Sequence, residues 1–274
     1  MSENAQGNRL FLGDCLRVVD RLQKENYRLV YLDPPFLTGR VRVGSKNEMA
    51  YDDRWPDHLR GYLPWLRERI AAMKALLCEN GSLVIHLDYR AVHYAKVLLD
   101  EIFGYGFFVN EIIWHYTGGG RSKNRFSCKH DTLLWYSRGE KPYFDRDAVR
   151  VPYKATSGFA RGGIVSAMGK KYLPHPRGTP VDDVWDIPII NPLAHERVGY
   201  PTQKPVVLME RLISALSAKG EDVADLFCGS GSTLVAAQRL GRKWTGGDVS
   251  PEAVNCCRER LTSLCRGSIQ VITI

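Results

Sequence analysis

Long apolar runs are absent from this chain of 274 residues. No run approaches the roughly 18 apolar residues that a membrane-spanning helix needs. Residues 1–8 are polar and lack the apolar core of a secretory signal peptide. We therefore expect a cytosolic protein with no membrane partner.

Cysteine and histidine are present, but without the spacings of a disulfide framework or a zinc site. The chain has seven cysteines, an odd number, with no C-x-x-C pair, and Cys256 and Cys257 are adjacent. Its seven histidines show no H-E-x-x-H pattern. The sequence therefore predicts no metal centre. It also lacks internal repeats and low-complexity tracts.

The overall composition is ordinary for a globular protein, with 44% hydrophobic and 25% charged residues. The length suits one large α/β domain with insertions, or two small domains.

Positive charge is concentrated in one part of the chain. Residues 115–177 contain thirteen Lys and Arg but only four Asp and Glu, whereas the whole chain carries a net charge of +8. The remainder is therefore close to neutral. A basic insert on a near-neutral body is the electrostatic pattern expected of a nucleic-acid-binding protein. The alternative is a solvated basic loop without a partner.

The segment from Leu29 to Phe36 joins a short apolar run to a carboxylate, two prolines and an aromatic ring. The run is too short for a helix and suits a buried strand. Neither proline has an N–H for a sheet ladder, so the strand ends at Asp33. Pro34 also favours an extended backbone at Asp33. We predict a stiff turn that presents one carboxylate, free carbonyl groups and an aromatic face.

This turn has the chemistry for methyl transfer to an exocyclic amino group of a nucleobase. The lone pair of such a nitrogen is delocalised into the ring, which makes it a poor nucleophile. Asp33 and the carbonyl of Pro34 can each accept one N–H and draw the nitrogen toward a tetrahedral geometry, while Phe36 stacks on the base. The alternative is a strand followed by a Pro-Pro turn with a capping aspartate.

A second motif follows the pattern strand, glycine loop, helix. Residues 223–233 run from an apolar segment through Gly229 and Gly231, and Asp248 ends the next expected strand. The two glycines allow a ligand to approach the backbone, and an acidic residue in this position can hold ribose hydroxyls.

The ligand predicted for this loop is S-adenosylmethionine. The dinucleotide fingerprint fails because its third glycine would fall on Leu234, and no Walker lysine follows the glycines. Asp225, before the loop, would repel a pyrophosphate but can bind the ammonium group of a methionine moiety. This combination favours S-adenosylmethionine over NAD or ATP.

Strands and helices are expected to alternate along the chain. Apolar periodicity predicts strands at 9–14, 27–32, 82–87, 109–116, 131–136, 223–226, 244–248 and 270–274, and helices at 15–22, 66–77, 92–103, 208–216, 234–237 and 251–264. Asp14 is placed to cap the first of these helices. Residues 37–58 show no clear period and are predicted to form a long loop.

Taken together, three motifs closely resemble the S-adenosylmethionine-dependent DNA amino-methyltransferases. They are Asp33-Pro34-Pro35-Phe36, Thr202-Gln203-Lys204-Pro205 and Asp225-Leu226-Phe227-Cys228-Gly229-Ser230-Gly231, with the basic insert between the first two. Their order is similar to that of the beta class, and the resemblance covers nearly the whole chain.

The resemblance implies an α/β, Rossmann-like methyltransferase fold. The expected sheet is mostly parallel and seven-stranded, ends in an antiparallel strand and has helices on both faces. It implies a division into a catalytic half (1–137), an inserted target-recognition region (138–199) and a cofactor-binding half (200–274).

The resemblance also implies roles for individual residues. It places Asp14 near the cofactor adenine, Asp248 at the ribose, and Thr202 with Asp225 at the methionine end. The expected catalytic residues are Asp33, Pro34, Pro35 and Phe36. The expected cofactor-binding residues are Asp14, Thr202, Lys204, Asp225, Phe227, Gly229, Ser230, Gly231, Ser232, Thr233 and Asp248. The expected DNA-binding residues are Arg40, Arg42, Lys46, Arg121, Lys123, Arg125 and Lys129.

In this family an aspartate in the first position of the catalytic motif accompanies N6-adenine methylation, and a serine is typical of N4-cytosine enzymes. Asp33 therefore favours adenine in double-stranded DNA. The alternatives are N4-cytosine methylation, a catalytically idle DNA-binding subunit of the same fold, and methylation of structured RNA or a protein. The resemblance implies a homodimer, a cognate restriction endonuclease and a bacterial or archaeal cytosol, close to the nucleoid.

Overall fold

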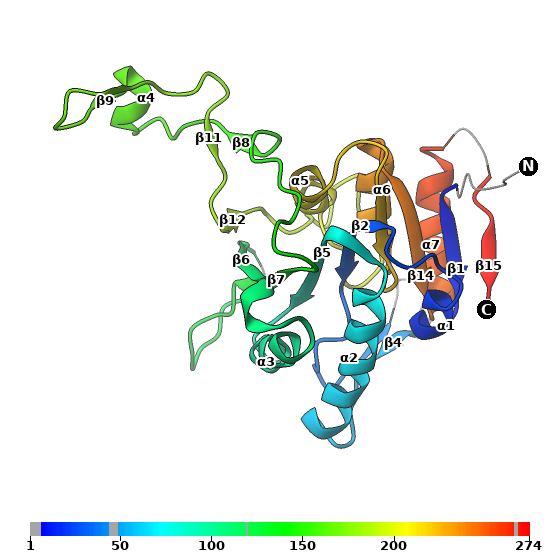
Figure 1. Cartoon of the computed structure of the whole chain (residues 1–274). Coiled ribbons are helices and arrows are strands. Elements are labelled where there is room, and N and C mark those ends of the chain that lie inside the picture. Colours follow the sequence, from blue (N-terminus) through cyan, green and yellow to red (C-terminus); the bar gives the residue numbers. More distant parts are fainter. Residues whose placement is uncertain (1–6, 44–48, 119, 266–267) are drawn as a thin grey trace, which may run out of the picture.

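The computed structural model describes residues 7–43, 49–118, 120–265 and 268–274. A large twisted sheet runs through the body with helices on both sides, and one arm of the chain projects away from it (Figure 1). In the described ranges, no helix is long and apolar enough to cross a membrane.

The central sheet has nine strands in the order β12-β6-β7-β5-β2-β13-β14-β1-β15. Their bounds are β1 (Arg9–Leu12), β2 (Tyr27–Leu32), β5 (Leu77–Leu87), β6 (Phe108–His115), β7 (His130–Ser137), β12 (Val184–Asp186), β13 (Asp222–Asp225), β14 (Lys243–Asp248) and β15 (Val271–Thr273). The expected seven strands form the centre, and the edge strands β12 and β15 have three residues each.

Only β7 runs antiparallel to its neighbours β5 and β6; the other paired strands of the described sheet are parallel. The expectation that the sheet ends in its antiparallel strand is therefore wrong. β6 and β12 lie beyond β7, because β6 and β7 form a hairpin and the insert returns along the outer edge of β6.

Helices cover the two faces of the sheet as two groups. Their bounds are α1 (Cys15–Val19), α2 (Leu59–Lys74) and α3 (Val92–Phe103) on one face, and α5 (Val206–Leu216), α6 (Ser232–Arg239) and α7 (Pro251–Thr262) on the other. A one-turn 3-10 helix, η1 (Tyr105–Phe107), follows α3.

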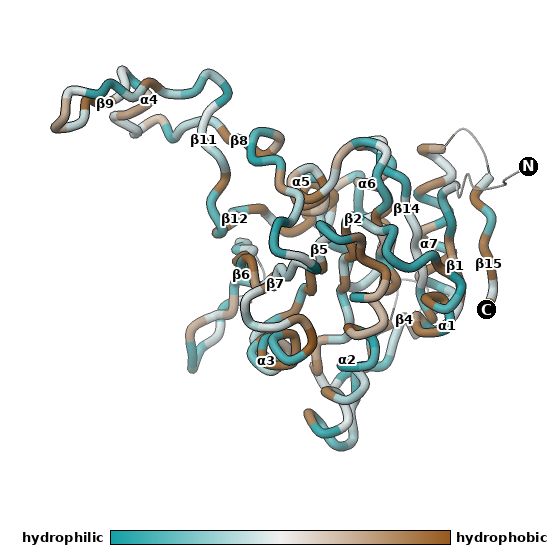
Figure 2. The backbone as a smooth tube through the Cα atoms, in the orientation of Figure 1, coloured by the Kyte–Doolittle hydropathy of each residue, from teal (hydrophilic) through white to brown (hydrophobic). Residues whose placement is uncertain are grey.

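Strand β2 shows why both faces are apolar. Successive side chains of a strand point to opposite faces. Leu29 and Tyr31 pack with α5 and α6, whereas Val30 and Leu32 pack with α1, α2 and α3. All four are almost completely buried. The hydropathy colouring shows hydrophobic residues through the centre of the sheet (Figure 2). A strand covered on both sides needs a continuous apolar run, which is what the sequence contains.

The segment after β2 contains a hairpin where the sequence predicted a loop without regular structure. Strands β3 (Val41–Val43) and β4 (Met49–Asp52) pair antiparallel. Fully buried Asp53 then ties the hairpin to the turn after β2. Its carboxylate accepts hydrogen bonds from the backbone N–H groups of Leu37 and Thr38 at 3.0 and 2.8 Å, from the Thr38 hydroxyl at 2.6 Å and from the Trp55 indole at 3.1 Å.

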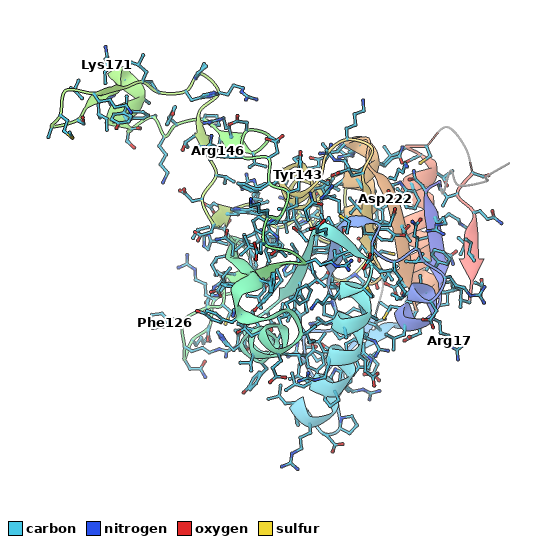
Figure 3. The ribbon with its side chains drawn as sticks, viewed as in Figure 1. Arg17, Phe126, Tyr143, Arg146, Lys171 and Asp222 are labelled. Carbon is cyan, nitrogen blue, oxygen red and sulfur yellow. The ribbon has the colours of Figure 1, made fainter. Side chains whose placement is uncertain are left out.

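The predicted insert forms the projecting arm. Its elements are α4 (Gly158–Gly162) and two short antiparallel pairs, β8 (Arg150–Val151) with β11 (Thr179–Pro180) and β9 (Ile164–Val165) with β10 (Lys171–Tyr172). Lys171 marks its outer end (Figure 3). The region 138–199 does not leave the body entirely, because β12 near its end pairs with β6 in the central sheet.

Candidate active site

Three acidic residues meet at one edge of the sheet. Strands β2, β13 and β14 are adjacent and parallel, and Asp33, Asp225 and Asp248 stand at their carboxyl ends. A cavity of about 460 Å³ opens there. The carboxyl edge of a parallel sheet is the usual ligand site of α/β folds.

Most of the predicted catalytic and cofactor residues line this cavity. Those that do are Asp33, Pro34, Pro35, Phe36, Thr202, Lys204, Asp225, Phe227, Gly229, Ser230, Ser232, Thr233 and Asp248, together with Arg42 from the hairpin. The first sequence motif, which ends more than 150 residues before the other two begin, thus meets them at one site.

The catalytic turn is held from below and from one side. The buried hydroxyl of Tyr62 on α2 donates a 2.7 Å hydrogen bond to the carbonyl of Pro35. The ring of Phe36 lies 5.7 Å from the ring of His86, centroid to centroid, and 5.1 Å from the Lys204 ammonium. These contacts fix the direction of the Phe36 ring at the cavity wall.

Asp33 is paired through one carboxylate oxygen only. Lys204 Nζ donates to Asp33 Oδ2 at 2.5 Å, and the two side chains are 11% and 17% exposed. The other oxygen, Oδ1, is buried and has no hydrogen-bond partner among the described residues. Burial acts to lower the pKa of Lys204, but the charge and hydrogen bond of Asp33 outweigh burial and raise this pKa. The lysine is therefore a cation, and Asp33, which lines the cavity, keeps one buried carboxylate oxygen without a donor among the described residues.

A buried chain of polar groups supports Phe36 and its neighbours. His86, at the end of β5, is fully buried, and its ring nitrogens lie 2.7 Å from the Tyr31 hydroxyl and 3.2 Å from Asp131. Tyr116 donates a 3.0 Å hydrogen bond to the same carboxylate. Burial acts to raise the pKa of Asp131, but the bonds and charges of His86, Lys204 and Tyr116 lower it below the ordinary range.

The glycine loop is anchored by Asp248. One carboxylate oxygen accepts the N–H of Gly229 at 2.9 Å, and the other accepts the N–H of Ser250 at 2.9 Å. Burial nevertheless raises the pKa of Asp248 to about 6. Burial also raises the pKa of Asp225 to about 7, although the Phe227 N–H donates to it at 3.1 Å. Asp225 is buried and Asp248 half-buried, and two carboxyls with such pKa values favour a ligand that brings hydroxyl groups or positive charge.

The motif around Lys204 is joined to the glycine loop. The Ser232 hydroxyl donates a 2.7 Å hydrogen bond to the carbonyl of Lys204. At Gly229, with φ of +48°, an added Cβ would lie 3.2 Å from the Tyr200 ring. The loop and the segment 200–204 thus pack closely enough to form one wall of the cavity.

Gly231 is required by both backbone and packing. Its φ is +78°, and an added Cβ would lie 2.4 Å from the sulfur of buried Cys257. We expect Gly231→Ala to lower the free energy of unfolding by about 2–5 kcal/mol, from a left-handed alanine and overpacking. Gly220→Ala is the control for the backbone term, since φ is +84° there but the surrounding space is open. Equal losses in urea denaturation of the two variants would contradict a packing role.

Asp14 lies outside the cavity wall. It accepts the N–H of Leu16 at 3.0 Å as the N-cap of α1 and pairs with Arg69 at 2.8 Å. The capping alternative is therefore confirmed. Its approach to a bound ligand stays a prediction.

The residues predicted to contact DNA are mostly exposed. Arg40, Arg121, Lys123 and Arg125 are exposed on their loops, and Lys46 falls outside the described residues. Lys129 donates to the carbonyls of Gly118 and Gly120 in its own loop. Apart from that tether, these exposed cations can meet an external anion.

Sequence reasoning missed five aromatic residues that line the cavity: Tyr31, Tyr51, Trp55, Trp65 and Tyr200. The Trp65 ring packs edge-on against Trp55 at 5.1 Å and Phe227 at 5.9 Å. Only Tyr200 had a usable signal, since it lies two residues before the Thr202-Gln203-Lys204-Pro205 motif. The others come from β2, the hairpin, the segment after it and α2, and a single sequence does not specify that these elements meet at the cavity. They provide apolar faces for a planar ring.

Comparison with known sequences places the chain among DNA-modifying enzymes. A family model described as DNA methylase matches residues 27–259. Type II methyltransferase M.EcaI of Enterobacter cloacae is 30% identical over 315 residues, covering 92% of this chain and 69% of that protein. The DNA adenine methyltransferase YhdJ of Escherichia coli (strain K12) is 28% identical over 251 residues, covering 91% and 81%.

Solved structures share the fold. The PvuII DNA methyltransferase, which is cytosine-N4-specific, superposes with a TM-score of 0.67 at 21% identity, over 93% of this chain and 86% of that chain. A Thermus thermophilus protein in complex with S-adenosyl-L-methionine gives a TM-score of 0.65 at 22% identity, over 97% and 98%. The expected Rossmann-like methyltransferase fold is confirmed.

Proposed function

The chain belongs to the N6/N4 family of DNA methylases, and we propose that it methylates N6 of a flipped adenine in double-stranded DNA. The observation that carries the proposal is the pair of Asp33 oxygens: Lys204 holds Oδ2, and buried Oδ1 has no donor among the described residues. An exocyclic amino group supplies the missing donor. Because this group is paired inside a duplex, the base must leave the stack to reach Asp33.

The methyl donor is S-adenosyl-L-methionine, and the cavity residues fit it. Asp248 can accept from the ribose hydroxyls, and Asp225 can pair with the methionine ammonium. Gly229, with no Cβ, leaves the loop backbone open to the ligand. The rings of Trp65 and Phe227 offer apolar surface for the adenine, because both line the same cavity.

The residues of the catalytic turn position and activate the target nitrogen. Asp33 Oδ1 accepts one N–H and the Pro34 carbonyl accepts the other, which localises the lone pair on nitrogen. Phe36 stacks on the base, and Lys204 keeps the carboxylate oriented. The bound cofactor supplies the methyl carbon, whose bond to sulfur breaks as its bond to nitrogen forms. The amino group then loses one proton, for which Asp33 is the nearest base.

The choice of adenine depends on Asp33. Relatives of both kinds exist: YhdJ is named a DNA adenine methyltransferase, and the PvuII enzyme is cytosine-N4-specific. An aspartate in the first position of this motif, with an aromatic residue last, favours adenine. N4-cytosine is the second candidate, because its amino group presents the same two donors.

The direct test incubates the purified protein with methyl-labelled cofactor and, separately, duplex DNA, structured RNA and protein. Label in DNA, recovered as N6-methyladenine after digestion, is the expected result. N4-methylcytosine would replace the adenine assignment, label in RNA or protein would replace the DNA assignment, and no label would favour an idle DNA-binding subunit. Sequencing modified bases in expressing cells gives the recognition site.

Cofactor binding should depend on pH. Since burial raises the pKa of Asp225 to about 7, we expect affinity for S-adenosylmethionine to fall about 10-fold from pH 8 to pH 6. The sign follows from protonation, because a neutral carboxyl cannot pair with an ammonium. In the absence of ligand, Asp225 is protonated in the native state but ionised in the unfolded state at pH values between the ordinary carboxyl pKa and about 7. The contribution of Asp225 to the free energy of unfolding therefore falls as the pH rises through this range.

Calorimetric titrations at a series of pH values measure this effect. Asp225→Asn is the matched control, since an amide does not titrate. We expect weaker binding and a flatter pH profile for the variant. The same slope in both proteins would show that another group is responsible.

The exposed cations Arg40, Arg121 and Lys123 are proposed to contact phosphates on either side of the flipped base. Each true phosphate contact contributes a slope of about −0.9 in log affinity against log salt. We expect Arg40→Ala to reduce the slope by about that amount and to weaken all DNA sequences equally. Lys219→Ala is the control, because this exposed lysine precedes β13 at the opposite edge of the sheet. Identical slopes for Arg40→Ala and wild type would assign Arg40 elsewhere.

Two protein partners and a location remain proposals that follow from family resemblance. They are a second copy of the chain, a cognate restriction endonuclease and a cytosolic site close to the nucleoid. Type II methyltransferases such as M.EcaI are among the relatives, which supports the restriction-modification context.

A further inference from the structure

A second cavity of about 320 Å³ lies on the same edge of the sheet as the active site. We call it the flanking pocket and define it by Asp88, Tyr89, Arg90, Tyr116, Arg125 and Asp131, which line it. They come from the segment after β5, the end of β6, the start of β7 and the loop between β6 and β7.

The floor of the flanking pocket is made of two nearly buried carboxylates. Asp131 is occupied by His86 and Tyr116. Asp88 is 8% exposed, and its carboxylate receives hydrogen bonds only from the backbone and guanidinium of Arg90 among the described residues. An ionised carboxylate has about four acceptor positions. Asp88 therefore keeps acceptor capacity toward the pocket.

The rim of the flanking pocket combines an aromatic face with cations. Arg90 lies 4.7 Å and Arg125 lies 5.9 Å from the centre of the Tyr89 ring. Phe126, next to Arg125, is 99% exposed, and its side chain points outward from the loop between β6 and β7 (Figure 3). This rim offers a planar surface and guanidinium donors to an incoming ring.

The charges on the flanking pocket select against a phosphate. Two carboxylates at the floor repel an anion, although Arg90 and Arg125 attract one at the rim. A neutral planar group that both donates and accepts hydrogen bonds suits the free acceptor positions of Asp88 and the two guanidinium groups. A nucleobase edge has this character, and a carboxylate is a suitable acceptor for an exocyclic amino group.

The position of the flanking pocket relates it to the target base. β2 and β5 are neighbours, with Leu32 beside Ile85 in register, so the catalytic turn lies beside His86. Asp88 follows two residues later. His86 contacts both Phe36, at 5.7 Å between ring centroids, and Asp131, at 3.2 Å. The two cavities thus share a wall.

We propose that the flanking pocket binds the major-groove edge of a base adjacent to the target adenine and, through Asp88, selects a base with an amino group on that edge, N6 of adenine or N4 of cytosine. The inference rests on the proposed function. The unpaired partner of the target is not the ligand, because thymine has no exocyclic amino group. Asp88 is then a specificity residue in the catalytic half of the chain, outside the predicted recognition region.

The test compares the sites methylated in DNA by the wild-type protein and by Asp88→Ala, using sequencing of modified bases. We expect one position next to the target, restricted to adenine or cytosine in the wild type, to lose about 10-fold of its discrimination in the variant. Asp88→Asn, of the same shape and able to accept from Arg90, is the second variant if alanine disturbs folding. Cofactor affinity should be unchanged in both.

Two further variants separate base reading from phosphate contact. Arg125→Ala changes the rim of the pocket, and Arg121→Ala changes an exposed cation of the same loop that does not line it. We expect only Arg125→Ala to alter base preference. A uniform loss of affinity with a shallower salt slope for Asp88→Ala or Arg125→Ala, or a wild-type preference for guanine or thymine, would overturn the inference.

The outcomes also separate this inference from the proposed function. If the wild type and both Asp88 variants methylate the same site with the same base preference, the role proposed for the flanking pocket is wrong and the proposed function stands. A wild-type protein that modifies no DNA would overturn the proposed function and this inference together.

Discussion

Asp33→Asn is expected to lower the rate of methyl transfer by about 10²–10⁴-fold, the range in which a positioned acid–base group contributes, with little change in cofactor affinity. The reason is the orientation forced by Lys204. Its ammonium requires an acceptor at the position of Oδ2, so the amide oxygen of asparagine faces Lys204. The amide NH₂ then takes the place of Oδ1 and meets the target amino group donor against donor.

Single-turnover assays with labelled cofactor measure the rate, and calorimetry measures cofactor binding. Asp52→Asn is the control, because Asp52 lines the same cavity but is paired with Arg54 at its exposed end. The control should stay within a few-fold of wild type. Retention of a substantial fraction of the rate by Asp33→Asn would rule out the role given to Asp33.

The second large effect is expected for Lys204→Met. The variant leaves the carboxylate of Asp33 buried without a counter-charge, which typically lowers the free energy of unfolding by about 3–5 kcal/mol. Because the charge of Asp33 raises the pKa of Lys204 despite burial, the ion pair contributes fully below the ordinary lysine pKa. Its contribution is lost only as the pH rises through the raised value. The ion pair is therefore fully formed at neutral pH, and Lys204→Met should show its full loss of stability there.

The double variant Asp33→Asn with Lys204→Met distinguishes stability from catalysis. Removing both charges should restore much of the stability in urea denaturation, since no unpaired ion remains. It should not restore methyl transfer, which needs the Asp33 acceptor. Additive losses of stability in the double variant would show that the two groups do not act as a pair.

The strands and the edge of the site were predictable because their signals are local. The run from Tyr27 to Leu32 is apolar at every position that packs against a helix, and proline ends it beside Asp33. Gly229 and Gly231 are required by backbone angles, and Asp248 ends the next strand. Parallel strands bring such termini together whatever the intervening sequence, so the motifs located the cavity.

The features of the fold and the site that the sequence did not predict depend on contacts between residues far apart in the chain. Lys204 lies in the cavity of the predicted cofactor site, but its ion pair with Asp33, 171 positions away, has no signal in the sequence. The path of the hairpin after β2 is set by one buried carboxylate, Asp53, whose partners are mostly backbone groups that carry no sequence signal. The place of β7 inside the sheet follows from hairpin pairing with β6, which apolar periodicity does not reveal.

The sheet order has a consequence for how the chain folds. Central strand β2 pairs with β13 through residues 29–31 and 223–225. One edge of β2 therefore has no partner strand until residues 223–225 have been synthesised. Pairings of such long sequence separation fold slowly, because the entropy of loop closure must be overcome first. At a synthesis rate of about 5–20 residues per second, an apolar strand edge stays open for roughly ten seconds or more. A chain interrupted before residue 222 would keep that edge as a template for aggregation.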